Sequence, residues 1–224
     1  MSDKQPVRID VVSDVVCPWC FIGKSRLEKA LKLKPGIPVE VHYRPYFLND
    51  WIPREGMSRH QYLTTKFGSV ERYEGIAQRV GMAARQEGLV YDASKLGSQP
   101  NTIDCHRLIR WAGERGDADA ATMKQRLMEM YFSEGADLTQ RDTLVKAAVD
   151  CGLDEAQVRA DLDSDKDIEA VTREAEQAKE AGIQGVPCFI FGGMLAVSGA
   201  QDPQHLADAI QRVSDELAKG EAAE

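Results

Sequence analysis

The spacing of apolar and polar residues changes along the chain, and each change predicts a different element. Residues 7–13 alternate apolar and polar side chains, which predicts a strand that stops near residue 13. A helical period follows from Cys17 and is closed by Pro35 and Gly36, after which residues 39–45 alternate again. A strand, a helix and a second strand at this spacing predict a parallel unit with a right-handed crossover.

The middle of the chain has a helical period throughout. Residues 58–181 keep this period, interrupted only at glycine-rich breaks, and predict a helical block without strands. Two apolar runs then follow, residues 188–191 and 194–197, joined by a Gly-Gly turn that is typical of a β-hairpin. A last amphipathic helix is expected after Pro203.

Composition and net charge limit the kinds of binding partner and the cellular location that we expect. The 224 residues include 36 acidic and 28 basic side chains, a net charge of −8 that disfavours phosphate backbones and anionic membranes. We therefore expect no nucleic-acid and no membrane partner. No stretch approaches the roughly 18 consecutive apolar residues of a membrane-spanning helix, and the N-terminal residues lack an apolar export leader. These features predict a cytoplasmic protein.

The most informative motif is Cys17-Pro18-Trp19-Cys20, which follows the first strand and opens a helix. Unpaired amides at a helix N-terminus favour thiolate over thiol, so Cys17 is predicted to be the solvent-facing nucleophile. Cys20 lies on the inward stripe of the helix and is predicted to be the resolving thiol. Cys17 would attack a substrate disulfide, and Cys20 would then displace the product and close the internal disulfide.

A zinc site is the competing interpretation of a C-x-x-C pair, and it requires further ligands. The remaining cysteines, Cys105, Cys151 and Cys188, stand singly and at no ligand-pair spacing. We expect no metal. An odd count of five cysteines in a chain with no export leader also argues against a framework of structural disulfides.

Three segments carry a family resemblance. They are Ser13-Asp14 with Cys17-Pro18-Trp19-Cys20-Phe21-Ile22-Gly23, then Asn101-Thr102 with His106-Arg107-Leu108, and finally Gly185-Val186-Pro187 with Val197-Ser198-Gly199-Ala200-Gln201. With these motifs the sequence resembles the DsbA family of thiol–disulfide oxidoreductases, within it the FrnE-like branch. The resemblance implies an α/β, thioredoxin-like fold, formed by residues 1–57 and 182–224, with a large all-helical domain inserted at 58–181.

The resemblance also implies that Val186 and Pro187 form a cis peptide beside the cysteine pair. Together with Pro18 and Trp19, these residues are the predicted substrate-binding positions, and the backbone of Val186 would pair with a substrate strand. Trp19 stands where DsbA has a histidine that stabilises its thiolate, so a less oxidising enzyme is expected. Cys188 follows the proline and is interpreted as a packed thiol.

The resolving thiol needs a proton-transfer partner, and the candidates in the sequence are Asp14 and Glu40. Asp14 also fits the role of a turn residue before the helix. His106 sits beside an apolar helical stripe and is interpreted as a partly buried, hydrogen-bonded histidine rather than a catalytic one.

Three functions remain open. The first is a dithiol–disulfide oxidoreductase acting on protein or small-molecule disulfides, with no cofactor beyond its own Cys17–Cys20 disulfide and with glutathione or thioredoxin as electron partner. The second is a glutathione-dependent kappa-class transferase or 2-hydroxychromene-2-carboxylate isomerase, although such relatives typically carry serine at the position of Cys17. The third is a non-enzymatic holdase. Sequence leaves the oligomeric state and the direction of electron flow open.

Overall fold

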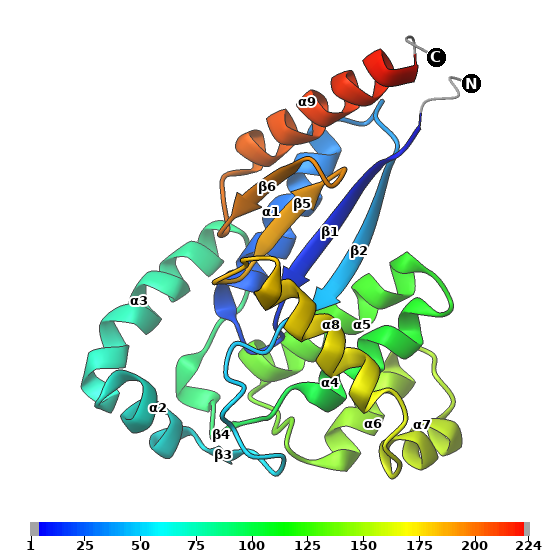
Figure 1. Ribbon diagram of the computed structural model, residues 1–224. Coiled ribbons are helices and arrows are strands. Elements are labelled where there is room, and N and C mark those ends of the chain that lie inside the picture. Colours follow the sequence, from blue (N-terminus) through cyan, green and yellow to red (C-terminus); the bar gives the residue numbers. More distant parts are fainter. Residues whose placement is uncertain (1–4, 222–224) are drawn as a thin grey trace.

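The computed structural model describes residues 5–221 and is a mixed α/β structure built around one four-stranded sheet (Figure 1). The strand order is β2-β1-β5-β6. Strands β1 and β2 are parallel, and β5 pairs antiparallel with both β1 and β6. The elements of the sheet and its two covering helices are β1 (Val7–Ser13), α1 (Pro18–Leu33), β2 (Val39–Pro45), β5 (Cys188–Phe191), β6 (Leu195–Ser198) and α9 (Pro203–Glu221).

The chain between β2 and β5 is mostly helical. It holds β3 (Met57–Ser58), α2 (Arg59–Phe67), α3 (Val70–Gln86), η1 (Ala93–Lys95), β4 (Ser98–Gln99), α4 (Ile103–Gly113), α5 (Asp117–Glu129), η2 (Met130–Glu134), α6 (Arg141–Asp150), α7 (Glu155–Leu162) and α8 (Ile168–Glu180). The thioredoxin-like α/β fold class predicted from the sequence is confirmed, as are the parallel β1–α1–β2 unit and the β5–β6 hairpin.

The expectation of a middle segment without strands is wrong in one detail. Met57 and Ser58 of β3 pair antiparallel with Gln99 and Ser98 of β4. Each strand has two residues, which is too short for an alternating pattern to appear in the sequence. The sequence therefore showed only the glycine and proline that flank β4, and they look like a break between helices.

Two buried clusters hold the molecule together. One lies between the sheet and the pair α1 and α9, where Ile9, Leu27, Phe189 and Ile210 are fully or almost fully buried. The other, larger cluster joins the first turn of α1 to the helices α4–α7 and η2. The stacked rings of Phe21 in α1 and Phe132 in η2, whose centroids are 5.6 Å apart, cross this boundary. The start of α1 is thus packed against the helical segment as well as against the sheet.

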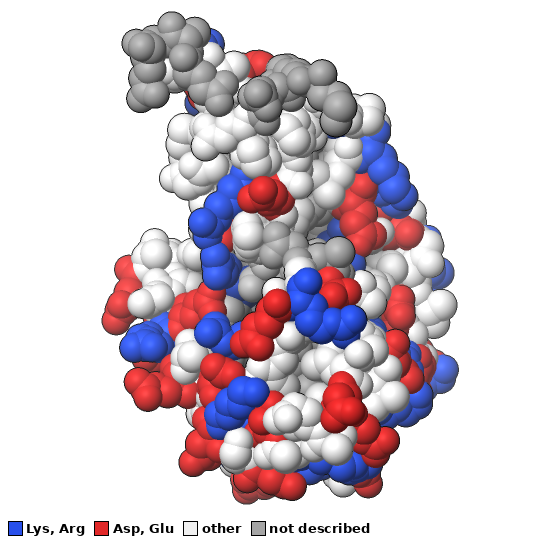
Figure 2. All heavy atoms as spheres, turned by 90° about the vertical axis from the view of Figure 1, so that its right-hand side faces the viewer, with Lys and Arg blue, Asp and Glu red and all other residues white. Residues whose placement is uncertain are grey.

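On the face drawn in Figure 2, acidic and basic side chains are interspersed rather than gathered by sign. Within residues 5–221, no helix combines the length and the apolar character needed to cross a membrane.

Candidate active site

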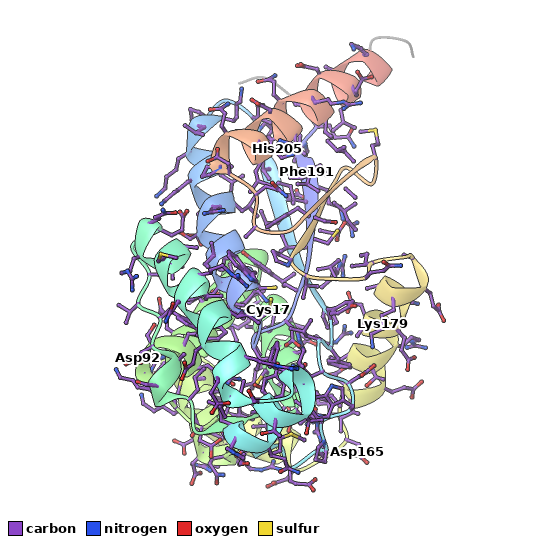
Figure 3. The ribbon with its side chains drawn as sticks, turned by 90° about the vertical axis from the view of Figure 1, so that its left-hand side faces the viewer. Cys17, Asp92, Asp165, Lys179, Phe191 and His205 are labelled. Atoms are coloured by element: carbon purple, nitrogen blue, oxygen red, sulfur yellow. The ribbon has the colours of Figure 1, made fainter. Side chains whose placement is uncertain are left out.

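Cys17 is the N-cap residue of α1, with Pro18 as the first helical residue. The extended backbone of Cys17 lets its carbonyl accept the amide hydrogens of Cys20 (2.9 Å) and Phe21 (3.3 Å). Proline fits this place because its fixed φ suits a first turn whose amides have no helical partner. Figure 3 shows Cys17 at the end of α1, where the sheet half of the molecule meets the helices.

The prediction that Cys17 faces solvent is wrong. Its exposed fraction is 3%, against 2% for Cys20, whereas Trp19 between them is 37% exposed. Two features outside the motif cover the sulfur. The Cys17 Sγ lies 3.5 Å from the carbonyl oxygen of Val186, and the residue shares its buried cluster with the helical segment. From the sequence alone, the N-terminus of this helix is expected to be open to solvent, because the segments that cover Cys17 lie far from it along the chain.

The two thiols nevertheless have opposite character. The pKa of Cys17 is lowered, first by a hydrogen bond from the Cys20 side chain and also by the backbone amides of Cys20 and Trp19, against the effect of burial. The pKa of Cys20 is raised well above its usual value, above all by burial and then by its hydrogen bond to Cys17. This asymmetry matches a nucleophile and a resolving thiol.

The peptide bond between Val186 and Pro187 is cis. The carbonyl of Pro187 accepts the amide of Gly199 (2.8 Å), while the carbonyl of Val186 accepts the Cys17 thiol. Helix α1 approaches this turn at Gly23, where an added Cβ would lie 2.9 Å from Pro187 Cγ. A glycine in the middle of a helix is explained here by the close approach of the proline ring.

Asp14 lies beside the cysteine pair and is 1% exposed. Its Oδ2 accepts the amide of Leu48 (2.9 Å), and its Oδ1 is 3.4 Å from Nε2 of His106, a distance at which the two atoms form no hydrogen bond in this structure. The carboxylate acts on Cys17, whose pKa it raises. His106 lies on α4 and is 4% exposed, more deeply buried than the partly buried histidine expected from the sequence, and its Nε2 has no hydrogen-bond partner in the described structure.

Glu40, the second candidate for proton transfer, does not reach the site. Its strand register places it opposite Arg8, five residues before the pair of Ser13 and Pro45 where the strands end. At about 3.3 Å per residue that is roughly 17 Å from the end of the sheet that carries the cysteines. The Glu40 side chain is 56% exposed and lies 3.9 Å from His42. The predicted parallel unit already placed the motif at the C-terminal end of both strands, so the position of Glu40 at the start of β2 argued against this candidate.

Two lysines of the helical segment interact electrostatically with the cysteine pair, and the sequence interpretation missed both. Lys66 of α2 donates to Asn49 Oδ1, and the strongest charge acting on it is that of Cys17. Lys124 of α5 is 1% exposed; burial lowers its pKa, and Cys20, when ionised, opposes that shift more than any other group.

The remaining cysteines lie on other elements than Cys17 and Cys20. Cys105 is fully buried in α4 and Cys151 is half-buried at the end of α6. Cys188 packs with Val12 and Tyr46, whereas the next residue on β5, Phe189, faces α1 and α9. Because successive strand residues point to opposite faces, the Cys188 thiol lies on the sheet face away from α1. Burial raises the pKa of each of these three thiols.

Comparisons with known proteins bear on this geometry. A family model described as a DSBA-like thioredoxin domain matches residues 8–211. The uncharacterized protein YwbO of Bacillus subtilis (strain 168) is 27% identical over 215 residues, which cover 95% of this chain and 98% of YwbO.

Several solved structures share the fold, including the following two. That of the probable DsbA oxidoreductase SCO1869 from Streptomyces coelicolor is 30% identical, with a TM-score of 0.85 over 94% of this chain and 91% of the other. That of a 2-hydroxychromene-2-carboxylate isomerase is 17% identical, with a TM-score of 0.69 over 95% and 98%. At 17% identity the second likeness concerns the fold alone.

Proposed function

Because the chain belongs to the DSBA-like thioredoxin-domain family, a family of thiol–disulfide oxidoreductases, we propose that it exchanges disulfides through Cys17 and Cys20. One observation carries the proposal: Cys17, with a lowered pKa, caps α1 beside Cys20 and within 3.5 Å of the carbonyl that precedes a cis proline. A thiolate at a helix start, a protonated thiol one turn further and a backbone edge for a substrate are the three parts that the exchange needs.

The reaction proceeds in two displacements. The Cys17 thiolate attacks one sulfur of the substrate disulfide, forms a mixed disulfide and expels the other substrate sulfur as a thiolate. Cys20 then loses its proton and attacks Cys17, which closes the Cys17–Cys20 disulfide and releases the second substrate thiolate. The substrate gains two electrons and the enzyme loses two. A dithiol donor or two monothiols, such as thioredoxin or glutathione, return the enzyme to its reduced form.

The substrate surface is made by Pro18, Trp19, Val186 and Pro187. Trp19 is the exposed residue of the motif and offers an apolar platform next to the buried sulfur. The Val186 carbonyl accepts the Cys17 thiol in this structure, so a substrate strand that pairs there approaches the sulfur directly. Main-chain pairing suits disulfide substrates of varied sequence, whether proteins or small peptides.

We place this activity in the cytoplasm, where it operates as a reductase or isomerase. The motif has tryptophan where a histidine would stabilise the Cys17 thiolate, and a less stable thiolate means a less oxidising enzyme.

The glutathione-dependent isomerase is the second candidate, because an isomerase structure shares the fold over nearly its whole length. Such an enzyme needs one activating hydroxyl or thiol, whereas disulfide exchange needs two thiols. The test is Cys20→Ala in an insulin-reduction assay with glutathione as donor and in an isomerisation assay with a chromene carboxylate. We expect loss of multiple-turnover insulin reduction and accumulation of covalent Cys17–substrate adducts, visible by mass spectrometry. Isomerisation that survives Cys20→Ala, without insulin reduction by the unmodified protein, would favour the isomerase.

A further inference from the structure

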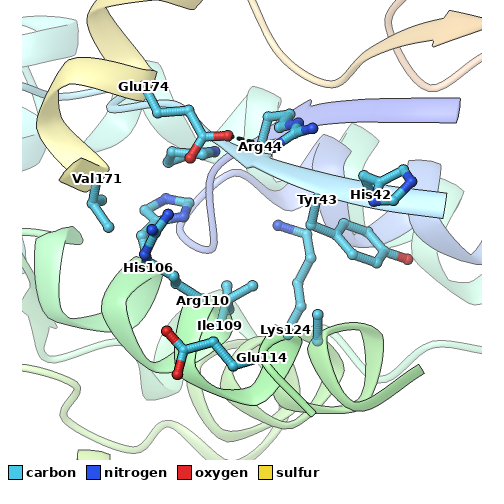
Figure 4. Close-up of a pocket in the computed structure, with 13 residues that line it drawn as sticks. His42, Tyr43, Arg44, His106, Ile109, Arg110, Glu114, Lys124, Val171 and Glu174 are labelled. Carbon is cyan, nitrogen blue, oxygen red and sulfur yellow. Dashed lines mark hydrogen bonds and ion pairs between the residues drawn. The ribbon is translucent and has the colours of Figure 1, made fainter. Parts of the chain in front are cut away.

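A cavity of about 280 Å³ lies between β2 and the helices α4, α5 and α8 (Figure 4). Neither Cys17 nor Cys20 lines it, so this space is separate from the site of disulfide exchange. Its walls carry both apolar and charged side chains. An enclosed apolar cavity of about 150 Å³ already accommodates benzene, so this cavity has room for a small organic molecule.

Lys124 brings a buried amino group to this cavity. The residue is 1% exposed, and its Nζ has no hydrogen-bond partner among the described residues. The side chain points from α5 toward β2, into the space between them (Figure 4). Its Nζ lies 5.5 Å from the centre of the Tyr43 ring, a contact that attracts the cation but leaves its three N–H donors unmet. Because a buried ammonium without partners is costly, the geometry favours an acceptor that enters the cavity from outside.

The two arginines of the wall already have carboxylate partners. Arg44 of β2 donates to Glu174 of α8 at 2.7 Å. Arg110 of α4 lies 3.3 Å from Asp167, and its side chain is 43% exposed. Lys124 differs from both, because no carboxylate of a described residue is hydrogen-bonded to it. The cavity can therefore take up one negative charge at Lys124 without breaking an existing ion pair.

The rest of the wall narrows the kind of anion. Glu114 and Glu174 also line the cavity, and these two carboxylates oppose a ligand with more than one negative charge. The apolar part of the wall comes from Ile109, Ala120 and Val171, all of which are buried. An ammonium donates strong hydrogen bonds to a carboxylate, and an aliphatic wall favours an apolar body. A molecule with one carboxylate and an apolar body satisfies both parts of the wall.

We propose that this cavity binds a small organic monocarboxylate, with the carboxylate on the ammonium of Lys124 and the apolar body against Ile109, Ala120 and Val171. The bound carboxylate supplies the acceptors that the buried N–H donors lack. Burial lowers the pKa of Lys124, and an anion beside the amine opposes that shift because it favours the charged form. The site does not depend on the disulfide exchange, since the cysteines are not part of it.

Four probes separate the contributions of charge and apolar body. Benzoate carries both, acetate carries the carboxylate alone, benzamide carries the ring without the charge, and inorganic phosphate is a different anion. Each is titrated at constant ionic strength into the full-length reduced protein, and amide proton–nitrogen NMR spectra report binding. Lys124→Met removes the charge at similar side-chain length, and Ala120→Leu fills the apolar part of the cavity. Lys146→Met on α6, where the lysine is 61% exposed, is the matched control.

We expect benzoate to bind saturably with a Kd below about 10 mM and to shift the amide signals of cavity residues such as Gly113, Ala120 and Val171. Acetate, benzamide and phosphate should each bind at least about tenfold more weakly than benzoate. Lys124→Met and Ala120→Leu should each weaken benzoate binding at least about tenfold, whereas Lys146→Met should leave it unchanged.

Several results overturn the proposal. One is the absence of saturable benzoate binding up to about 10 mM, and another is unchanged binding in Lys124→Met or in Ala120→Leu. Benzamide that binds as well as benzoate would leave an apolar cavity without an anion site, and phosphate that binds as well would remove the preference for a monocarboxylate. If Lys124→Met fails to fold, the shift map of the unsubstituted protein still decides, because shifts confined to residues outside the cavity also overturn the proposal.

Discussion

The contact between Gly23 and Pro187 makes a quantitative prediction about how α1 is seated against the site. In Gly23→Ala the new methyl would lie 2.9 Å from Pro187 Cγ and 3.2 Å from Phe189 Cζ. Both distances are closer than carbon atoms pack, at roughly 3.5–4.0 Å. Overpacking of this kind costs about 1–3 kcal/mol, while alanine in place of glycine inside a helix returns about 0.5–1 kcal/mol.

A matched variant isolates the packing effect. Gly75 lies inside α3, and a Cβ added there meets nothing within 4 Å, so Gly75→Ala should raise the free energy of unfolding by about 0.5–1 kcal/mol. In urea titrations of the reduced protein, we expect the free energy of unfolding of Gly23→Ala to be about 1–3 kcal/mol lower than that of Gly75→Ala. Equal stabilisation by the two substitutions would refute the close approach of α1 to the cis-proline turn.

Three further predictions concern the cysteine pair and its neighbours. Because the folded pKa of Cys17 is lowered, its thiolate stabilises the reduced protein above the unfolded pKa, and this stabilisation is lost as pH falls through the folded value. The unfolding free energy of the reduced protein, measured against Cys17→Ala, should therefore shrink toward acid, and a difference that grows there would contradict it. With Trp19 inside the motif, the reduction potential measured against glutathione should lie nearer about −270 mV than about −120 mV; a value near the latter would refute the argument. Glu40→Gln should leave insulin reduction unchanged whereas Asp14→Asn slows it, and the reverse order would restore Glu40 as a candidate.

What the sequence predicted well was local. The alternation in β1 and β2, the helix after Cys17 and the Gly-Gly hairpin are set by neighbouring residues, and all are present in the structure. The positions of the two cysteines also follow from local sequence, because one cysteine caps the helix and the other lies one turn inside it.

What it could not predict depends on contacts between distant segments. The burial of Cys17 comes from Val186, 169 residues away, and the charges near the two sulfurs come from Lys66 and Lys124. Glu40 is a different case. The parallel unit predicted from the sequence already implied that Glu40 lies at the end of the strand away from the motif, and the register with Arg8 confirms it.

The lysine partners of the two sulfurs have a consequence for how such an enzyme diversifies. Each sulfur sits on the sheet-bearing part of the chain, but Lys66 and Lys124 belong to α2 and α5 of the segment between β2 and β5. A substitution in that segment alters the charge beside one sulfur while the four-residue motif stays the same. Two proteins with identical C-x-x-C motifs can therefore evolve different redox behaviour through the inserted helices. The same motif on another scaffold would lack the charged side chains that these helices supply.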